Sequence, residues 1–270
     1  MGEFPGADAD PDDAAYAVVG APLDVSTTFR PGTRFGPDRV RRFARPFDDY
    51  DQRTDQHFSD LVFDSGDVAA WDDAADYLDF LEGSLRDHHD ADRLPVLVGG
   101  EHTVTVAGIR AADPDVYVCL DAHLDLYEAY AGNDHSHATV THHALDIADE
   151  AVLLGARTGS EAAWDRAAEA DVTVVPPEEV SEWVPAFDGD AYLSVDIDAA
   201  DPAFAPGTGT PEPFGLRSRE MRDAVRAVAP SAVGFDVVEV NDRDDGQAAS
   251  LAAKLLREFV FSHADGGSSA

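Results

Sequence analysis

Asp121-Ala122-His123-Leu124-Asp125 directly follows Val116–Leu120, an apolar run typical of a short buried strand. The same arrangement occurs twice more, with Gly99-Gly100-Glu101-His102 after Leu94–Val98 and with Asp196-Ile197-Asp198 after Ala191–Val195. Ligands of a parallel α/β sheet gather at the carboxyl ends of its strands. We therefore expect the three polar segments to meet at one edge of such a sheet.

These segments supply a set of metal donors. Alternate residues of a strand share one face, so Asp121, His123 and Asp125 are expected to point together. Burying two carboxylates beside an imidazole is costly without a cation. The predicted donors are six side chains: His102, Asp121, His123, Asp125, Asp196 and Asp198. Four carboxylates with two imidazoles suit a pair of Mn²⁺-like ions better than one Zn²⁺, which predicts a metallohydrolase.

Strands and helices alternate along the chain. Helices are expected near 38–43, 74–88, 103–112, 138–149, 160–170, 178–184, 218–228 and 247–261, and further strands at 15–20 and 232–240. This alternation predicts an α/β fold with a mainly parallel sheet covered on both faces. A length of 270 residues fits a single domain over 1–270, with flexible ends at 1–15 and 264–270.

The composition excludes several partners. A formal net charge of −35, with Lys254 the only lysine among 19 basic residues, disfavours nucleic acid as a partner. No signal peptide or membrane-spanning run is recognisable, and an internal disulfide is ruled out because Cys119 is the single cysteine. We expect a cytoplasmic protein with no membrane partner. Cys119 is interpreted as a small buried hydrophobe rather than a nucleophile.

The motifs together resemble the ureohydrolase family, the arginase and agmatinase group, and especially its agmatinases. The resemblance covers about residues 20 to 245. The matching segments are 29–37 (Phe-Arg-Pro-Gly-Thr-Arg-Phe-Gly-Pro), the three metal segments, Ser136-His137-Ala138-Thr139, Gly155-Ala156-Arg157, 201–213 and Gly234–Asn241.

The resemblance implies an arginase-like fold, a three-layer α/β/α sandwich, and two Mn²⁺ per chain. His102, Asp121, Asp125 and Asp196 would hold one ion, whereas His123, Asp121, Asp196 and Asp198 would hold the other. Asp121 and Asp196 would then be bridging carboxylates. Two such ions would activate a shared water, and Asp125 would orient it.

The resemblance also assigns roles in substrate binding and proton transfer. Glu239 matches the carboxylate that pairs with a guanidinium group, and His137 matches the histidine that passes a proton to the departing amine. Thr210 is expected either to hydrogen-bond in the pocket or to stabilise the turn that carries it. His135, His142 and His143 are interpreted as surface or helix histidines.

The chain departs from the family pattern at three places. Phe214 stands where a second glycine is more common, so the wall of the pocket is expected to differ. Residues 140–143 (Val-Thr-His-His) replace a segment that often carries basic residues. Glu101 replaces the aspartate of many members.

Substrate choice is the least decided point. Arginases usually place a carboxylate-binding Asn where this chain has Tyr127, and the loop Glu128–Asp134 is acidic. Agmatine, which carries an amine instead of a carboxylate, therefore fits best, with putrescine and urea as products. Other guanidino compounds, such as arginine or guanidinobutyrate, and a catalytically silent metal-binding member remain alternatives. Family resemblance implies a homo-oligomer, a trimer or hexamer.

The charge generates a first prediction. Repulsion among 35 excess negative charges destabilises the folded state in dilute buffer, whereas about 1 M salt shortens the Debye length to roughly 3 Å. We expect the melting temperature and the activity to rise between about 0.1 and 2 M KCl, as in a protein adapted to a molar-salt cytoplasm. A melting temperature that stays flat or falls over this range would remove the halophilic interpretation.

Overall fold

The sheet determines where the site forms. The computed structural model describes residues 3–169, 171–241 and 243–267, and within these an eight-stranded parallel sheet has the order β4-β1-β5-β10-β9-β6-β7-β8. Its strands are β1 (Tyr16–Ala21), β4 (Val62–Asp67), β5 (Leu94–Gly99), β6 (Val116–Leu120), β7 (Glu150–Leu154), β8 (Val172–Val175), β9 (Ala191–Asp196) and β10 (Ala232–Val238). A small antiparallel pair, β2 (Tyr50–Asp51) with β3 (Gln56–His57), lies outside this sheet.

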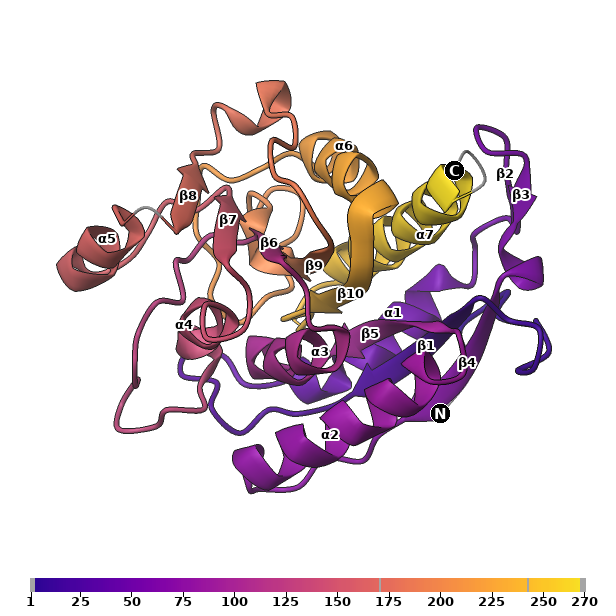
Figure 1. The fold of residues 1–270 in the computed structure, drawn as a ribbon, viewed down its shortest axis with the longest axis horizontal. Helices are drawn as coiled ribbons and strands as arrows, with labels where there is room; N and C mark the ends of the chain where they lie inside the picture. The colour runs from indigo at the N-terminus through magenta and orange to yellow at the C-terminus, as the bar shows by residue number, and fades with distance from the viewer. Residues whose placement is uncertain (1–2, 170, 242, 268–270) are drawn as a thin grey trace.

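Helices cover both faces of the sheet (Figure 1). One face packs against α1 (Gly36–Ala44), α6 (Ser218–Val228) and α7 (Gln247–Gly267). The other face packs against α2 (Ala74–His89), α3 (Thr105–Ala112), α4 (Val140–Ala144) and α5 (Glu161–Ala167). Successive strand residues point to opposite faces of the sheet and so belong to two hydrophobic cores, one on each face. Val118, for example, belongs to the core on the first face and Cys119 to the core on the second. The predicted three-layer α/β/α sandwich is confirmed.

Some secondary-structure elements differ from those expected from the sequence. Strands β4, β7 and β8 were not expected from the sequence; they lie toward the two edges of the sheet. The stretch 178–184, expected to be a helix, contains only a short 3₁₀ turn at Val180–Glu182.

The ends are also better packed than expected. Phe4, within the segment 1–15 that was expected to be flexible, is buried with its ring 5.5 Å from that of Phe58. Helix α7 continues to Gly267, into the predicted flexible tail. Apolar contact explains the first difference, because Phe4 occupies core space that composition alone does not reveal. Residues 1, 2 and 268–270 lie outside the described residues.

Four neighbouring strands, β5, β10, β9 and β6, form the centre of the sheet. Leu120 pairs with Val195, and Val238 pairs with Asp196, so these strands end at nearly the same level. The segments that follow them are therefore brought side by side, although up to 137 residues separate them in the sequence.

Candidate metal centre and substrate cavity

The first donor group surrounds one nitrogen of His102, in the 3₁₀ turn after β5. His102 Nδ1 lies 3.0 Å from Asp125 Oδ2, 3.3 Å from Asp121 Oδ2 and 3.5 Å from Asp196 Oδ2. All four side chains are buried. Ligand atoms about 2.1 Å from an octahedral ion lie roughly 3 Å apart, so this spacing fits a divalent cation among these atoms.

The second donor group surrounds His123. Its Nδ1 lies 3.1 Å from Asp198 Oδ2 and 3.4 Å from Asp121 Oδ1. Asp121 thus directs one carboxylate oxygen to each group, the arrangement of a bridging ligand. Asp196 differs from the expected second bridge, because only its Oδ2 faces His102, while its Oδ1 accepts a hydrogen bond of 2.8 Å from the N–H of Asp198.

Backbone geometry aims these side chains. Strand β6 ends at Leu120, so Asp121, His123 and Asp125 do not alternate along a strand as expected. Instead Asp125 has a left-handed backbone with φ of 49°, which turns its carboxylate toward His102. Such a conformation costs a non-glycine residue about 1–2 kcal/mol, and such strain gathers at functional sites.

The electrostatics of the centre favour a cation. Burial, reinforced by the negative charge of Asp121, raises the pKa of Asp125 to about 6. Burial and the neighbouring carboxylates of Asp198 and Asp121 raise the pKa of Asp196 well above its usual range. Each shift means that negative charge is disfavoured there. A bound cation would remove that penalty, and the mixture of carboxylates and imidazoles suits Mn²⁺.

Polar residues behind the donors hold them in place. Thr210 donates to Asp198 Oδ2 at 3.0 Å, so it orients a donor as well as lining the cavity. On the far side of His102, Nε2 lies 3.2 Å from Ser194 Oγ, and Ser194 donates to Asp236 Oδ1 at 2.6 Å. Neither Ser194 nor Asp236 was expected from the sequence to have a role. The sequence did contain one indication of a role for Ser194: it stands two residues before Asp196 and therefore lies on the same face of β9.

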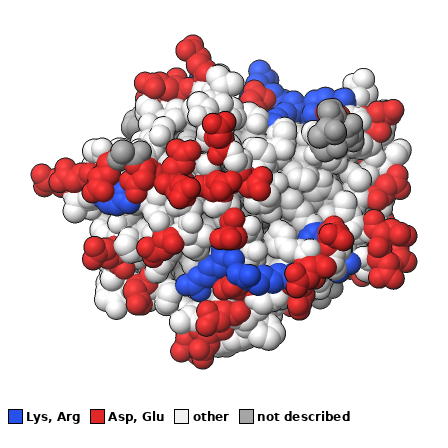
Figure 2. Space-filling model, in the orientation of Figure 1, with Lys and Arg blue, Asp and Glu red and all other residues white. Residues whose placement is uncertain are grey.

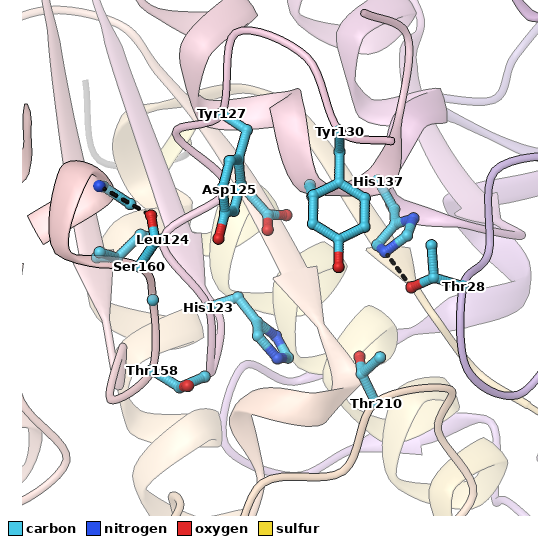
Figure 3. A pocket seen from close by; sticks show the side chains of 13 residues that line it. Thr28, His123, Leu124, Asp125, Tyr127, Tyr130, His137, Thr158, Ser160 and Thr210 are labelled. Carbon is cyan, nitrogen blue, oxygen red and sulfur yellow. Dashed lines mark hydrogen bonds between the residues drawn. The ribbon is translucent and has the colours of Figure 1, made fainter. Parts of the chain in front are cut away.

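A cavity of about 340 Å³ opens beside the second donor group (Figure 3). Its lining includes Thr28, His123, Asp125, Tyr127, Tyr130, His137, Thr158, Ser160 and Thr210. Figure 3 shows the rings of Tyr127 and Tyr130 directed into this space, next to Asp125 and His137. Their ring centroids lie 5.2 Å apart in an edge-to-face arrangement.

His137 stands at the rim with both ring nitrogens engaged. Nε2 lies 3.3 Å from Thr28 Oγ1, and Nδ1 lies 3.3 Å from Ser26 Oγ. Burial lowers the pKa of His137, so the neutral imidazole predominates at pH 7. Ser26 and Thr28 belong to a loop more than 100 residues earlier, and local sequence patterns gave no signal for their contact with His137.

Glu239 lies deeper than expected of a substrate-pairing residue. It is buried, and its Oε1 accepts a hydrogen bond of 2.8 Å from the N–H of His102. Burial raises its pKa to about 8. Glu239 does not line the cavity, but it lies close behind one of its walls. Its Oε2 would be 3.3 Å from a Cβ added at Gly209, the residue before the cavity residue Thr210.

Other singled-out residues lie outside the cavity. The rings of His135 and His143 stack 5.3 Å apart, and His143 Nε2 hydrogen-bonds to the carbonyl of Asp134. Phe214 is 85% exposed and does not form the expected part of the pocket wall. Cys119 is buried beside His102, and burial raises the pKa of its thiol to about 11.

Fold and site together define a class of α/β protein with two imidazole–carboxylate groups at the ends of parallel strands. The arginase family model matches residues 14–262. The N(1)-aminopropylagmatine ureohydrolase of Thermococcus kodakarensis is 34% identical over 259 residues, spanning 92% of this chain and 90% of the relative. The agmatinase of Bacillus cereus is 33% identical, spanning 93% and 92%.

Solved structures of ureohydrolases and amidinohydrolases have the same fold. The agmatine ureohydrolase of Thermoplasma volcanium superposes with a TM-score of 0.91 at 31% identity, covering 100% of this chain and 96% of its own. The proclavaminate amidinohydrolase of Streptomyces clavuligerus gives 0.88 at 31% identity, with 98% coverage of both chains. The chain belongs to the arginase family and is an amidinohydrolase.

The shared carboxylate generates a second prediction. Asp121→Asn removes the charge that both donor groups use, so we expect metal content to fall below one ion per chain and the rate to fall at least about 100-fold. Metal analysis of the purified protein after dialysis measures the first, and urea release measures the second. Asp72→Asn, at an exposed position, is the matched control. Full occupancy of two ions in Asp121→Asn would contradict the bridging role.

Proposed function

We propose that this chain is a binuclear manganese hydrolase that cleaves the guanidinium group of agmatine to give putrescine and urea. One observation carries the proposal: the two oxygens of Asp121 face two separate imidazole-centred donor groups beside the cavity. The family fixes the reaction class, and the two donor groups support the metal pair.

The proposed ligands follow from the distances. His102, Asp121, Asp125 and Asp196 would hold one Mn²⁺, and His123, Asp121 and Asp198 the other. A bridging role for Asp196 is proposed from the family resemblance alone. When bound, the two ions would lower the pKa of a shared water and so supply the nucleophile.

The remaining steps belong to the protein. Asp125 lines the cavity, where its carboxylate can orient the attacking water. Thr210 keeps Asp198 in place through its hydroxyl. His137, neutral at pH 7, would accept at Nε2 the proton that the attacking water loses and pass it to the departing amine, a task suited to an imidazole near neutral pH. Glu239 would pair with the guanidinium at the deep end of the cavity, past Thr210.

The cavity lining supports a substrate tail without a carboxylate. Neither Lys nor Arg is among the lining residues, so a carboxylate there would lack a cationic partner. The hydroxyls of Tyr127, Tyr130, Thr158 and Ser160 offer acceptors to an ammonium group, and the tyrosine rings offer cation–π contact. Glu128 and Asp134, on which the sequence argument relied, do not line the cavity. The amine preference therefore rests on the tyrosines instead.

A longer amine is a second candidate substrate. The 34% identical relative is named for N(1)-aminopropylagmatine, which extends the amine end of agmatine. Tyr127 and Tyr130 line the cavity and are partly exposed to solvent, so an extended cation could leave the site beside them. This observation favours such a compound over a carboxylated guanidine.

Among the described residues, no helix is long and apolar enough to cross a membrane. We propose a cytoplasmic enzyme whose partner is a small guanidino substrate rather than nucleic acid or a membrane. By family resemblance we further propose a homotrimer or homohexamer.

Substrate choice gives the third prediction. Agmatine should exceed L-arginine and guanidinobutyrate in kcat/KM by at least about 100-fold, roughly 2.7 kcal/mol of transition-state discrimination, because only the carboxylated compounds lack a partner in the cavity. Urea release by the Mn²⁺-loaded enzyme in molar KCl measures this, with N(1)-aminopropylagmatine as a fourth substrate. Preference for either carboxylated guanidine would overturn the agmatinase proposal, and no urea from any compound would favour a silent member.

A further inference from the structure

A buried carboxylate next to the metal centre is left unused by the mechanism above. Glu101 is fully buried and belongs to neither donor group. Its Oε1 accepts hydrogen bonds from Ser26 Oγ at 2.8 Å and from Thr103 Oγ1 at 2.9 Å. Its Oε2 accepts from the N–H of Ser26 at 2.7 Å and from Thr27 Oγ1 at 3.4 Å. Four donors facing one side chain match an acceptor-only carboxylate.

Ser26 connects Glu101 to His137. A serine hydroxyl has one proton to donate and two lone pairs to accept with. Its shortest side-chain contact, 2.8 Å, donates that proton to Glu101. Ser26 Oγ also accepts from the backbone N–H of His137 at 3.0 Å, and it lies 3.3 Å from Nδ1 of the same residue. With its proton committed to Glu101, Ser26 can only accept from that nitrogen.

The direction of this bond sets the tautomer of His137. If Ser26 Oγ accepts from Nδ1, then Nδ1 carries a proton, and in the neutral ring Nε2 is left with a free lone pair. Ser136 Oγ is the other hydroxyl near Nδ1, at a longer 3.5 Å. Nε2 faces Thr28 Oγ1 at the cavity, so it is the nitrogen that can exchange a proton with a bound substrate.

The backbone keeps this chain of contacts in register. The N–H of Glu101 donates to the carbonyl of Leu23 at 2.8 Å, and that of Gly100 donates to Ala21 at 2.7 Å. A Cβ at position 100 would collide with the carbonyl oxygen of Leu23, so glycine is required for this close approach. The loop carrying Ser26 is thereby fixed against the turn after β5.

We propose that Glu101 is a positioning residue for His137: through Ser26 it fixes the proton on Nδ1 and leaves Nε2 as the nitrogen that exchanges a proton at the cavity. The proposal rests on the role given to His137 in the proposed function. Its structural part, the tautomer, can be measured without any turnover.

Glu101→Gln tests it because an amide reverses one hydrogen bond. If the amide nitrogen took the place of Oε2, two N–H groups, its own and that of Ser26, would face each other. The amide nitrogen should therefore take the place of Oε1, where it donates a hydrogen bond to the hydroxyl of Ser26. Ser26 is then free to donate to Nδ1, which moves the proton of the neutral ring to Nε2. In serine proteases the comparable Asp→Asn change, which leaves the wrong tautomer, lowers kcat about 10⁴-fold.

The measurement is ¹⁵N NMR of histidine-labelled protein loaded with diamagnetic Mg²⁺, with the His137 signals assigned by their loss in His137→Asn. We expect the Nδ1–H tautomer in the unsubstituted protein and the Nε2–H tautomer in Glu101→Gln. With Mn²⁺, Glu101→Gln should lower kcat for agmatine at least about 100-fold, with KM within about threefold and two metals retained. Thr27→Val, which removes a donor to the other oxygen of Glu101, should stay within about twofold.

The outcomes separate the two proposals. An unchanged tautomer in Glu101→Gln would overturn the positioning role, as would wild-type kcat in that variant. If the buried substitution prevents folding, Ser26→Ala breaks the same link at a half-exposed residue, and it should lower kcat with the same small change in KM. An unsubstituted protein with the expected tautomer but no turnover of any guanidine would refute the proposed function and leave the positioning of His137 intact.

Discussion

Burial of four carboxylates within a few ångströms of each other is the constraint on which the rest of this structure depends. All four side chains are buried, so each charge must find a hydrogen bond or a cation. Backbone N–H groups supply part of that need, since Asp121 accepts from the N–H of His123 at 2.6 Å and Asp198 accepts from Ala122 at 3.1 Å. Each of the four carboxylates also places an oxygen within 3.5 Å of His102 Nδ1 or His123 Nδ1. The turns after the strands therefore fix the position of every donor before any ion binds.

The same electrostatic problem is solved differently elsewhere in the molecule. Arg41 is buried between Asp64 and Asp67 at the edge of the sheet, with contacts of 2.7 and 2.5 Å. Here the protein provides its own cation. Over the surface, Figure 2 shows acidic side chains spread across the visible face and basic ones in a few small groups. With a net charge of −35, that surface is expected to depend on dissolved salt, whereas the buried centre is proposed to depend on bound metal.

Sequence patterns indicated the candidate donors because their residue types are unusual after apolar strands. His102, Asp121 and Asp196 needed no structure to be singled out, and the parallel sheet followed from the alternation of elements. Strand β4 was missed because its sequence, Val-Phe-Asp-Ser-Gly-Asp, has no apolar run; its acids serve Arg41 instead. Strands β7 and β8 were missed because neither is followed by the acidic and imidazole residues that singled out β5, β6 and β9.

The finer geometry was beyond reach for a different reason. The left-handed turn at Asp125, the depth of Glu239 and the contact of Ser26 with His137 all arise from tertiary packing across long sequence separations. Periodicity and propensity describe only local structure, so no pattern in the sequence could report them. Motif resemblance named Glu239 and His137, but it gave neither their burial nor their partners.

The central claim is that one carboxylate, Asp121, joins two metal sites. Anomalous X-ray scattering from crystals grown with Mn²⁺ tests it directly, because it locates the ions without reference to activity. We predict two manganese peaks on either side of the Asp121 carboxylate, one next to His102 Nδ1 and the other next to His123 Nδ1. A single peak, or two peaks of which neither contacts Asp121, would contradict this account.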